Sequence, residues 1–278
     1  MQFWHNGEMG AQAHCDATGA GVLLGQGVFT TIGVWSGRPF LLESHLARLR
    51  ENAHILDVPL DWSDAEIANA LEAVLRANEI KSGIARLTAT ARRDGRWNAQ
   101  TGGDLLIMAQ PRAPENTVAP LRLTLSAFRL DARRPLAGIK STSYAEYSRI
   151  AREAQNRGFD EAVICNGHSV LCECARANLF WARGETIFTP SLQTGCLPGV
   201  ARRFVLECCA PEGIETREGA FSLFDLTDAD EVFLTAATTG PRAAISLSWG
   251  EEENSYAAPG PMTQKLQAMW RNAVEVSR

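Results

Sequence analysis

The spacing of apolar residues in the first third of the chain predicts a mixture of strands and helices. Two apolar runs typical of β structure cover 27–34 and 105–109. A third run, 84–92, alternates between apolar and polar residues, as in a strand with one buried face. Apolar residues recur every three or four positions between Leu42 and Leu56, which predicts a helix over 43–56. Ser63 and Glu66 form a capping box, and the apolar stripe behind them predicts a second helix. Asp94-Gly95 predicts a turn.

The second half of the chain is richer in predicted strands. They cover 121–126, 161–165, 169–173, 178–182, 186–189 and 231–236, and helices are expected over 144–157, from 199 through 206, and over 262–273. Asn166-Gly167 predicts a tight hairpin turn. Three of the twelve prolines lie within 110–120, as in an exposed linker. We therefore expect an α/β (α+β) chain with a small N-terminal domain (1–112), a linker (113–120) and a larger, strand-rich C-terminal domain (121–278).

Composition excludes several classes of protein. The 278 residues carry 27 Lys+Arg against 32 Asp+Glu, a net charge of −5, so no basic field suggests nucleic acid or an anionic membrane as partner. No apolar run approaches the ~20 residues of a spanning helix, and the first residues lack a signal-peptide pattern, so a cytoplasmic location is expected. The seven cysteines show no paired C-x2-C spacing, so we expect reduced thiols and no metal site.

Two residues are candidates for chemistry. Lys140 lies between a predicted strand and a predicted helix, where a desolvated lysine can act as a nucleophile that forms a Schiff base; the alternative is an ordinary surface lysine. Glu173 lies in an apolar setting at the end of a hairpin strand, and a buried carboxylate needs a cationic partner. That partner is either a protonated pyridine nitrogen or an internal arginine such as Arg176.

Two further segments are candidates for binding a phosphate group. Leu197-Pro198-Gly199 runs into a predicted helix, whose first backbone N–H groups are free to bind an anion. Small residues and hydroxyls follow a strand at 235–240, where a phosphate cup or a plain turn explains the pattern about equally well.

Taken together and in this order, these elements resemble the fold-type IV (class IV) family of pyridoxal-phosphate-dependent enzymes. That family contains branched-chain aminotransferases, D-amino-acid aminotransferases and aminodeoxychorismate lyases. The similar stretches are 25–31 with 41–53, 140–144, 158–162, 173–180, and 189–190 with 197–202. The resemblance extends over roughly residues 1 to 245 and implies a two-domain fold, pyridoxal 5'-phosphate as cofactor, and a homodimer.

The resemblance also implies roles for individual residues. Lys140 would form the Schiff base with the cofactor and carry the proton, and Glu173 would keep the pyridine nitrogen protonated. The phosphate would be held by Arg48, by the backbone of Val200 and Ala201, and by hydroxyls of Thr238 and Thr239. Relatives often have a threonine at the position of Ala201, so that hydroxyl is missing here. Tyr144 resembles a tyrosine that binds the phenolic oxygen, although its spacing from the lysine is one residue shorter than in branched-chain enzymes.

The family resemblance does not by itself select one reaction. Thr31, Arg86, Arg92 and Arg96 are expected near the substrate, since a guanidinium binds a carboxylate with two hydrogen bonds, although a solvated turn accounts for part of the arginine cluster. Phe29-Thr30-Thr31 is similar to the lyase branch, whereas 233–237 lacks the asparagine that lyases place near the substrate carboxylate. We favour an aminotransferase acting on an amino acid and a 2-keto acid. An aminodeoxychorismate lyase that releases pyruvate and 4-aminobenzoate is the alternative, and a non-catalytic descendant is a third hypothesis.

Overall fold

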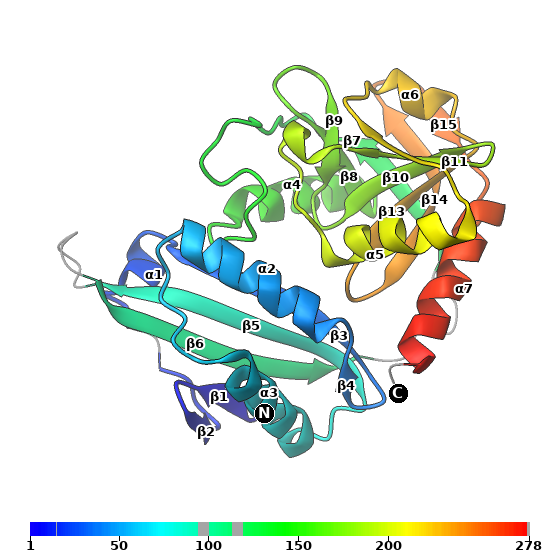
Figure 1. The fold of residues 1–278 in the computed structure, drawn as a ribbon. Helices are drawn as coiled ribbons and strands as arrows, with labels where there is room; N and C mark the ends of the chain where they lie inside the picture. The colour runs from blue at the N-terminus through cyan, green and yellow to red at the C-terminus, as the bar shows by residue number, and fades with distance from the viewer. Residues whose placement is uncertain (15, 94–99, 113–118, 277–278) are drawn as a thin grey trace. The chain divides into compact units, whose positions relative to one another are not determined.

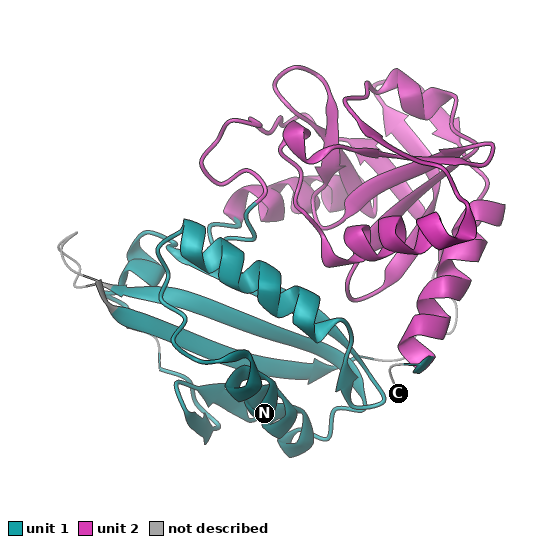
Figure 2. Cartoon of the chain, viewed as in Figure 1, with its two compact units in different colours: residues 1–115, 139–144, 276–278 teal, residues 116–138, 145–275 magenta. Residues whose placement is uncertain are grey.

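The structure is a computed structural model that describes residues 1–14, 16–93, 100–112 and 119–276. The chain forms two compact units, shown in different colours in Figure 2. Unit 1 comprises Met1–Glu115, Ile139–Tyr144 and Val276–Arg278, and unit 2 comprises Asn116–Gly138 and Ala145–Glu275. The prediction of a mixed α/β chain is confirmed. The turn expected at 94–95 and residues 113–118 of the expected linker lie outside the described residues.

Unit 1 is built on a six-stranded antiparallel sheet with the order β2-β1-β6-β5-β3-β4. Its strands are β1 (Phe3–His5), β2 (Glu8–Gly10), β3 (Gly27–Trp35), β4 (Arg38–Pro39), β5 (Ser82–Arg93) and β6 (Gln100–Pro111). Its helices are α1 (Ala20–Leu23), α2 (Leu42–Ile55) and α3 (Asp64–Ala77). The apolar faces of α2 and α3 bury Leu49 and Leu71 against the sheet residues Leu87 and Ile107, which forms one core (Figure 1).

Local sequence signals explain where these helices begin. The predicted capping box is present, because Ser63 Oγ accepts a hydrogen bond from the Glu66 N–H at 3.2 Å and Glu66 Oε2 accepts one from the Ser63 N–H at 2.7 Å. Strand β6 is longer than the 105–109 expected, since β5 pairs with it from Gln100 to Pro111. The added residues include Gly102 and Gly103, which carry no apolar alternation, so only pairing with β5 defines them as strand.

Unit 2 contains a nine-stranded mixed sheet with the order β12-β11-β10-β13-β14-β7-β8-β9, and β15 pairs with β14. The strands are β7 (Leu121–Leu125), β8 (Glu161–Cys165), β9 (Leu171–Cys174), β10 (Asn178–Arg183), β11 (Thr186–Pro190), β12 (Thr216–Gly219), β13 (Glu231–Ala236), β14 (Gly240–Trp249) and β15 (Glu252–Ser255). The pairs β7–β8, β7–β14 and β11–β12 are parallel, and the other pairs are antiparallel.

The helices of unit 2 cover separate parts of this sheet (Figure 1). They are α4 (Ala145–Asn156), α5 (Val200–Cys209), α6 (Phe224–Thr227), α7 (Pro261–Val276) and the 3-10 turns η1 (Leu192–Thr194) and η2 (Ala210–Glu212). Residues of α4 pack with β8 and β9 in one apolar cluster, and α5 packs with α7, β10 and β13 in another. The predictions for α4, α5 and α7 are confirmed to within a few residues. Strands β1, β2, β4, β12, β14 and β15 were not predicted.

The hairpin of β8 and β9 is present, but its turn is longer than the tight turn predicted from Asn166-Gly167. The Asn166 N–H donates to the Val170 carbonyl at 2.8 Å, and Asn166 Oδ1 accepts from the N–H groups of His168 and Val170. Ser169 has a φ of 60°, so it belongs to the turn and β9 begins at Leu171. The asparagine side chain therefore organises a wider loop instead of a two-residue turn.

Segment 139–144 differs from the domain division expected from the sequence. It follows residue 120 along the chain, yet it belongs to unit 1. The reason is backbone hydrogen bonding with β3: the Phe29 N–H donates to the Lys140 carbonyl at 2.9 Å, and the Thr142 N–H donates to the Gly27 carbonyl at 2.8 Å.

Two properties of the described residues bear on the composition. No helix among them is both long and apolar enough to cross a membrane. Their six cysteines are free thiols, and all except Cys208 are buried. Burial raises the pKa of the Cys209 thiol to about 11, which is typical of an unreactive structural cysteine.

Candidate functional site

The backbone around Lys140 is fixed by β3 and α2. Besides its hydrogen bond from Phe29, Lys140 donates its own N–H to Asn52 Oδ1 at 2.8 Å. A Cβ atom at Gly27 would lie 2.8 Å from both Thr142 Oγ1 and the Ala89 carbonyl oxygen, so the close approach of this segment to β3 requires glycine there. Strand β3 and helix α2 thus determine where the lysine side chain begins.

The Lys140 side chain lies among aromatic rings. Lys140 is half-buried, and its Nζ donates to Tyr144 Oη at 3.3 Å and lies 4.8 Å from the centre of the Phe29 ring. Phe29 also contacts Tyr144 edge to face, and Arg86 Cζ lies 3.7 Å from the same ring. The structure therefore brings the predicted residues Lys140, Tyr144 and Arg86 together around Phe29, and it favours this packed lysine over a surface lysine.

A buried polar cluster joins α2 to β3 in the same unit. Arg48 is 7% exposed, and its Nη2 donates to Thr30 Oγ1 at 3.2 Å. Thr30 Oγ1 lies 2.6 Å from His45 Nδ1. Burial, followed by the charges of Arg48 and Lys140, lowers the pKa of His45 to about 3, so the imidazole is neutral near pH 7. Sequence analysis assigned no role to Thr30 or His45. The sequence signal for His45 is its i, i+3 spacing from Arg48 on the buried face of α2.

Of the four predicted substrate residues, the three that the structure describes do not all lie together. Thr31 is paired with Arg86 across β3 and β5, so these two side chains share a face of the sheet. Arg92 lies six residues further along β5, about 20 Å at ~3.3 Å per residue. Its Nη2 is 2.6 Å from Asp104 Oδ1 in an ion pair. Arg96 lies outside the described residues.

Glu173 is the buried carboxylate of unit 2. It is 3% exposed and pairs with Ile164 in the β8–β9 ladder. Its Oε1 accepts a hydrogen bond from Tyr147 Oη at 2.6 Å, and its Oε2 accepts one from the Leu197 N–H at 3.1 Å. Arg176, the alternative internal partner, instead donates from Nε to Glu161 Oε2 at 3.0 Å. Sequence analysis missed Tyr147, whose only signal is its place one helical turn after Tyr144.

The start of α5 lies next to this carboxylate through shared hydrogen bonds. The same Leu197 that donates to Glu173 accepts a hydrogen bond at its carbonyl from Asn178 Nδ2 at 2.8 Å. Gly199 is the N-cap of α5 and makes no side-chain cap, and a Cβ there would lie 2.0 Å from Asn178 Oδ1. Val200 and Ala201 are the first residues of α5, and helical geometry leaves their N–H groups without an intrahelical acceptor. The hydrogen bond from Leu197 thus brings the Glu173 carboxylate against the segment that leads into the start of α5, where free N–H groups can bind an anion.

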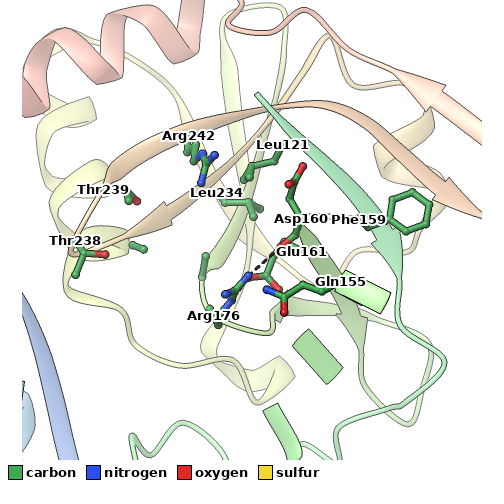
Figure 3. A pocket seen from close by; sticks show the side chains of 12 residues that line it. Leu121, Gln155, Phe159, Asp160, Glu161, Arg176, Leu234, Thr238, Thr239 and Arg242 are labelled. Carbon is green, nitrogen blue, oxygen red and sulfur yellow. Dashed lines mark hydrogen bonds and ion pairs between the residues drawn. The ribbon is translucent and has the colours of Figure 1, made fainter. Parts of the chain in front are cut away.

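Thr238 and Thr239 lie in the turn between β13 and β14, and both line a cavity of about 380 Å³ (Figure 3). Arg176 and Arg242 also line this cavity. Glu173, Val200 and Ala201 are not among its described lining residues. Three residues before Thr238, Thr235 Oγ1 is buried and has no hydrogen-bond partner among the described residues. Thr235 is paired with Asn178 across β10 and β13. It belongs to the candidate segment 235–240, from which the sequence analysis chose Thr238 and Thr239 instead.

Comparisons with known proteins agree on one family. The family described as amino-transferase class IV matches residues 27–246. The chain is 30% identical over 260 residues to an aminodeoxychorismate lyase of Bacillus subtilis (strain 168), covering 92% of this chain and 88% of that protein. It is 28% identical over 279 residues to a D-alanine aminotransferase of Bacillus licheniformis, covering 99% and 97%. The solved structure of a branched-chain aminotransferase from Thermoproteus uzoniensis with norvaline superposes with a TM-score of 0.91 at 25% identity, covering 100% of this chain and 96% of that chain.

Proposed function

We propose that this chain, which belongs to the class IV aminotransferase family, transfers an amino group between an amino acid and a 2-keto acid. Enzymes of this family use pyridoxal phosphate. When bound, this cofactor withdraws electrons from the substrate Cα, which no protein side chain does. The observation that carries the proposal is Glu173, a carboxylate that is 3% exposed, hydrogen-bonded at both oxygens, and adjacent to the uncapped start of α5.

The donor set of unit 2 fits the two ends of pyridoxal phosphate. A buried carboxylate matches a protonated pyridine nitrogen, and Glu173 holds that proton. The N–H groups of Val200 and Ala201 bind the phosphate at the positive end of α5. Thr238 and Thr239 provide hydroxyls to the same phosphate.

The family resemblance assigns cofactor roles to three residues of unit 1. Lys140 would hold the cofactor covalently until the amine of the substrate displaces it, and the freed Nζ would then take the proton from the substrate Cα. Its contacts with the rings of Phe29 and Tyr144 support this role, because they shield the amine from water. Tyr144 donates to the phenolic oxygen of the cofactor. Arg48 adds a positive charge for the phosphate, and its hydrogen bond to Thr30 holds the guanidinium in place.

The substrate carboxylate is assigned to the arginine nearest the lysine. Arg86 and Lys140 both contact the Phe29 ring, and Thr31 is paired with Arg86, so these groups surround the same point in unit 1. Arg92 and Arg96 are assigned a secondary part in substrate selection, since Asp104 already pairs with the Arg92 guanidinium. Arg86 therefore binds the α-carboxylate in this proposal.

An aminodeoxychorismate lyase is the second candidate. It is favoured by the 30% identity to the lyase of Bacillus subtilis. The aminotransferase is preferred because 233–237 reads Phe-Leu-Thr-Ala-Ala, without the asparagine that lyases place near the substrate carboxylate. Both reactions begin with removal of the Cα proton by Lys140, and they differ in what leaves afterwards.

The test is to supply the purified chain with pyridoxal phosphate and add D-alanine, L-glutamate or L-leucine in turn. The proposal expects one of them to convert the cofactor to pyridoxamine phosphate, seen by absorbance, with release of the matching 2-keto acid. Lys140→Ala should abolish the conversion, while Lys81→Ala, a change at an exposed lysine of the same unit, should not. Release of pyruvate and 4-aminobenzoate from aminodeoxychorismate, without any conversion by amino acids, would establish the lyase instead.

The homodimer and the cytoplasmic location stay predictions. Light scattering of the purified chain at several concentrations measures the first, and a mass of one chain at every concentration would contradict it. Fractionation of cells that express the chain measures the second.

A further inference from the structure

Tyr147 connects an arginine to the buried carboxylate of unit 2. It lies in the first turn of α4, and its Oη donates to Glu173 Oε1 at 2.6 Å. The same Oη accepts a hydrogen bond from Arg134 Nη2 at 2.6 Å, and Arg134 Cζ lies 5.2 Å from the centre of the Tyr147 ring. The ring packs against the apolar cluster between α4 and β8. Arg134 itself is held by an ion pair with Glu146.

These contacts favour the ionised form of Glu173. Burial alone disfavours a charged carboxylate, whereas hydrogen bonds donated to the carboxylate favour it. Tyr147 donates to one oxygen, and the Leu197 N–H donates to the other. Burial and the charge of Glu173 raise the pKa of Tyr147 above its ordinary value, so the hydroxyl keeps the proton it donates. The positive charge of Arg134 at the same hydroxyl strengthens it as a donor.

We propose that Tyr147, held by Arg134, is a positioning residue that keeps Glu173 ionised and oriented so that Glu173 holds a proton on the pyridine nitrogen of the cofactor. This inference rests on the proposed function, because it needs Glu173 to face that nitrogen. Without the Tyr147 hydroxyl, the carboxylate becomes a stronger base than before, and the proton on the pyridine nitrogen shifts toward it. The cofactor then becomes a weaker electron acceptor, although every residue that touches it is still present.

The test compares Tyr147→Phe with a matched control. Tyr147→Phe keeps the ring in the apolar cluster and removes only the hydroxyl. Tyr256→Phe removes a second buried hydroxyl of unit 2, one that has no hydrogen-bond partner among the described residues. Glu173→Gln identifies the carboxyl signal and tests the proposed function by itself. The full chain is prepared with and without pyridoxal phosphate, and the cofactor carries ¹⁵N in its ring.

Two readouts are independent of turnover. Carboxyl ¹³C NMR of the cofactor-free chain follows the titration of Glu173, and the proposal expects Tyr147→Phe to raise that pKa by about one unit, the effect of one lost charge-assisted hydrogen bond. The ¹⁵N shift of the bound cofactor should move toward that of an unprotonated pyridine in Tyr147→Phe and stay unchanged in Tyr256→Phe. Arg134→Gln should shift both readouts in the same direction by a smaller amount.

The outcomes separate the two proposals. If Tyr147→Phe leaves both readouts unchanged, or if Tyr256→Phe changes them equally, Tyr147 does not act on Glu173 and the inference is overturned. If Glu173→Gln leaves the ¹⁵N shift and the affinity for pyridoxal phosphate unchanged, Glu173 does not face the pyridine nitrogen. The proposed function then fails at this residue, whatever Tyr147→Phe does to the carboxyl titration.

Discussion

The buried imidazole of His45 predicts a loss of stability in mild acid. His45 is 1% exposed, and its neighbours Arg48 and Lys140 add to the cost of a positive charge, so its pKa is lowered to about 3 in the folded chain. In the unfolded chain the pKa is about 6.5. Between these two values the unfolded state binds more protons than the folded state. The free energy of unfolding therefore falls as the pH decreases from 6.5 toward 3.

The size of the effect follows from the two pKa values. One pKa unit corresponds to about 1.4 kcal/mol, so lowering the pH from 7 to 5 costs about 2 kcal/mol through His45 alone. The stabilising contribution of the neutral imidazole is fully present above pH 7. The hydrogen bond with Thr30 agrees with this state, because Thr30 accepts from Arg48 and can donate to a neutral Nδ1.

Urea unfolding at pH 5, 6 and 7 measures the effect by comparing the wild-type chain with His45→Asn. The asparagine keeps a polar atom near the position of Nδ1 but does not titrate. The difference in stability between the two chains should change by about 2 kcal/mol across this range, in favour of the variant at low pH. His54→Asn, at an exposed position of the same helix, is the control and should follow the wild type. Parallel curves for the wild type and His45→Asn would refute the reasoning.

Three further predictions concern charged side chains. Arg176→Met should lower the free energy of unfolding by about 2–3 kcal/mol at pH 8. The loss should be smaller at pH 5, because burial raises the pKa of Glu161 and its protonated form needs no partner; an equal loss at both pH values, measured by urea unfolding, would contradict this. Glu231→Gln should cost about 1–2 kcal/mol, since the carboxylate accepts two N–H groups at the start of α7, and an unchanged melting midpoint would speak against it. Arg86→Met should raise the KM for the amino donor roughly ten- to a hundredfold, while Arg92→Met should change it little; steady-state kinetics in which Arg92→Met has the larger effect would reverse the assignment.

The sequence alone identified most of the elements that have a local signal. The capping box at Ser63, the leucine spacing of α2 and the alternation in β5 depend on neighbours within a few residues, and each element formed where expected. The ends of β6 carry no such pattern and form strand because β5 pairs with them. Strand β14 was not predicted, although Ile245-Ser246-Leu247-Ser248-Trp249 alternates between apolar and polar residues. The turn after β8 was misjudged, since the side chain of Asn166 binds backbone groups two and four residues later and forms a wider loop.

The candidate site also contains residues that the sequence identified and residues that only the structure identified. Lys140, Glu173 and the helix start at Gly199 were selected from the sequence because their residue types and order match those of a known family. From the sequence, Arg176 was one of two alternative partners for Glu173. The structure shows that Arg176 instead forms an ion pair with Glu161. Tyr147 and Thr30 were not selected, because what distinguishes them is a hydrogen bond with a residue distant in the sequence. Thr235 lay in the candidate segment 235–240, but only the structure shows that its buried hydroxyl lacks a hydrogen-bond partner among the described residues.

The sequence by itself thus determined the family and the cofactor, since these depend on residue type and order, and it supplied the residues proposed to carry the chemistry. The tertiary structure decided which arginine lies beside Lys140 and which donors bind Glu173, because charges and hydrogen bonds act over a few ångströms in space. Arg86 and Arg92 look equivalent on one strand, yet one contacts Phe29 and the other is paired with Asp104. Tyr147 and Glu173 are 26 residues apart in the chain and share one hydrogen bond in the fold.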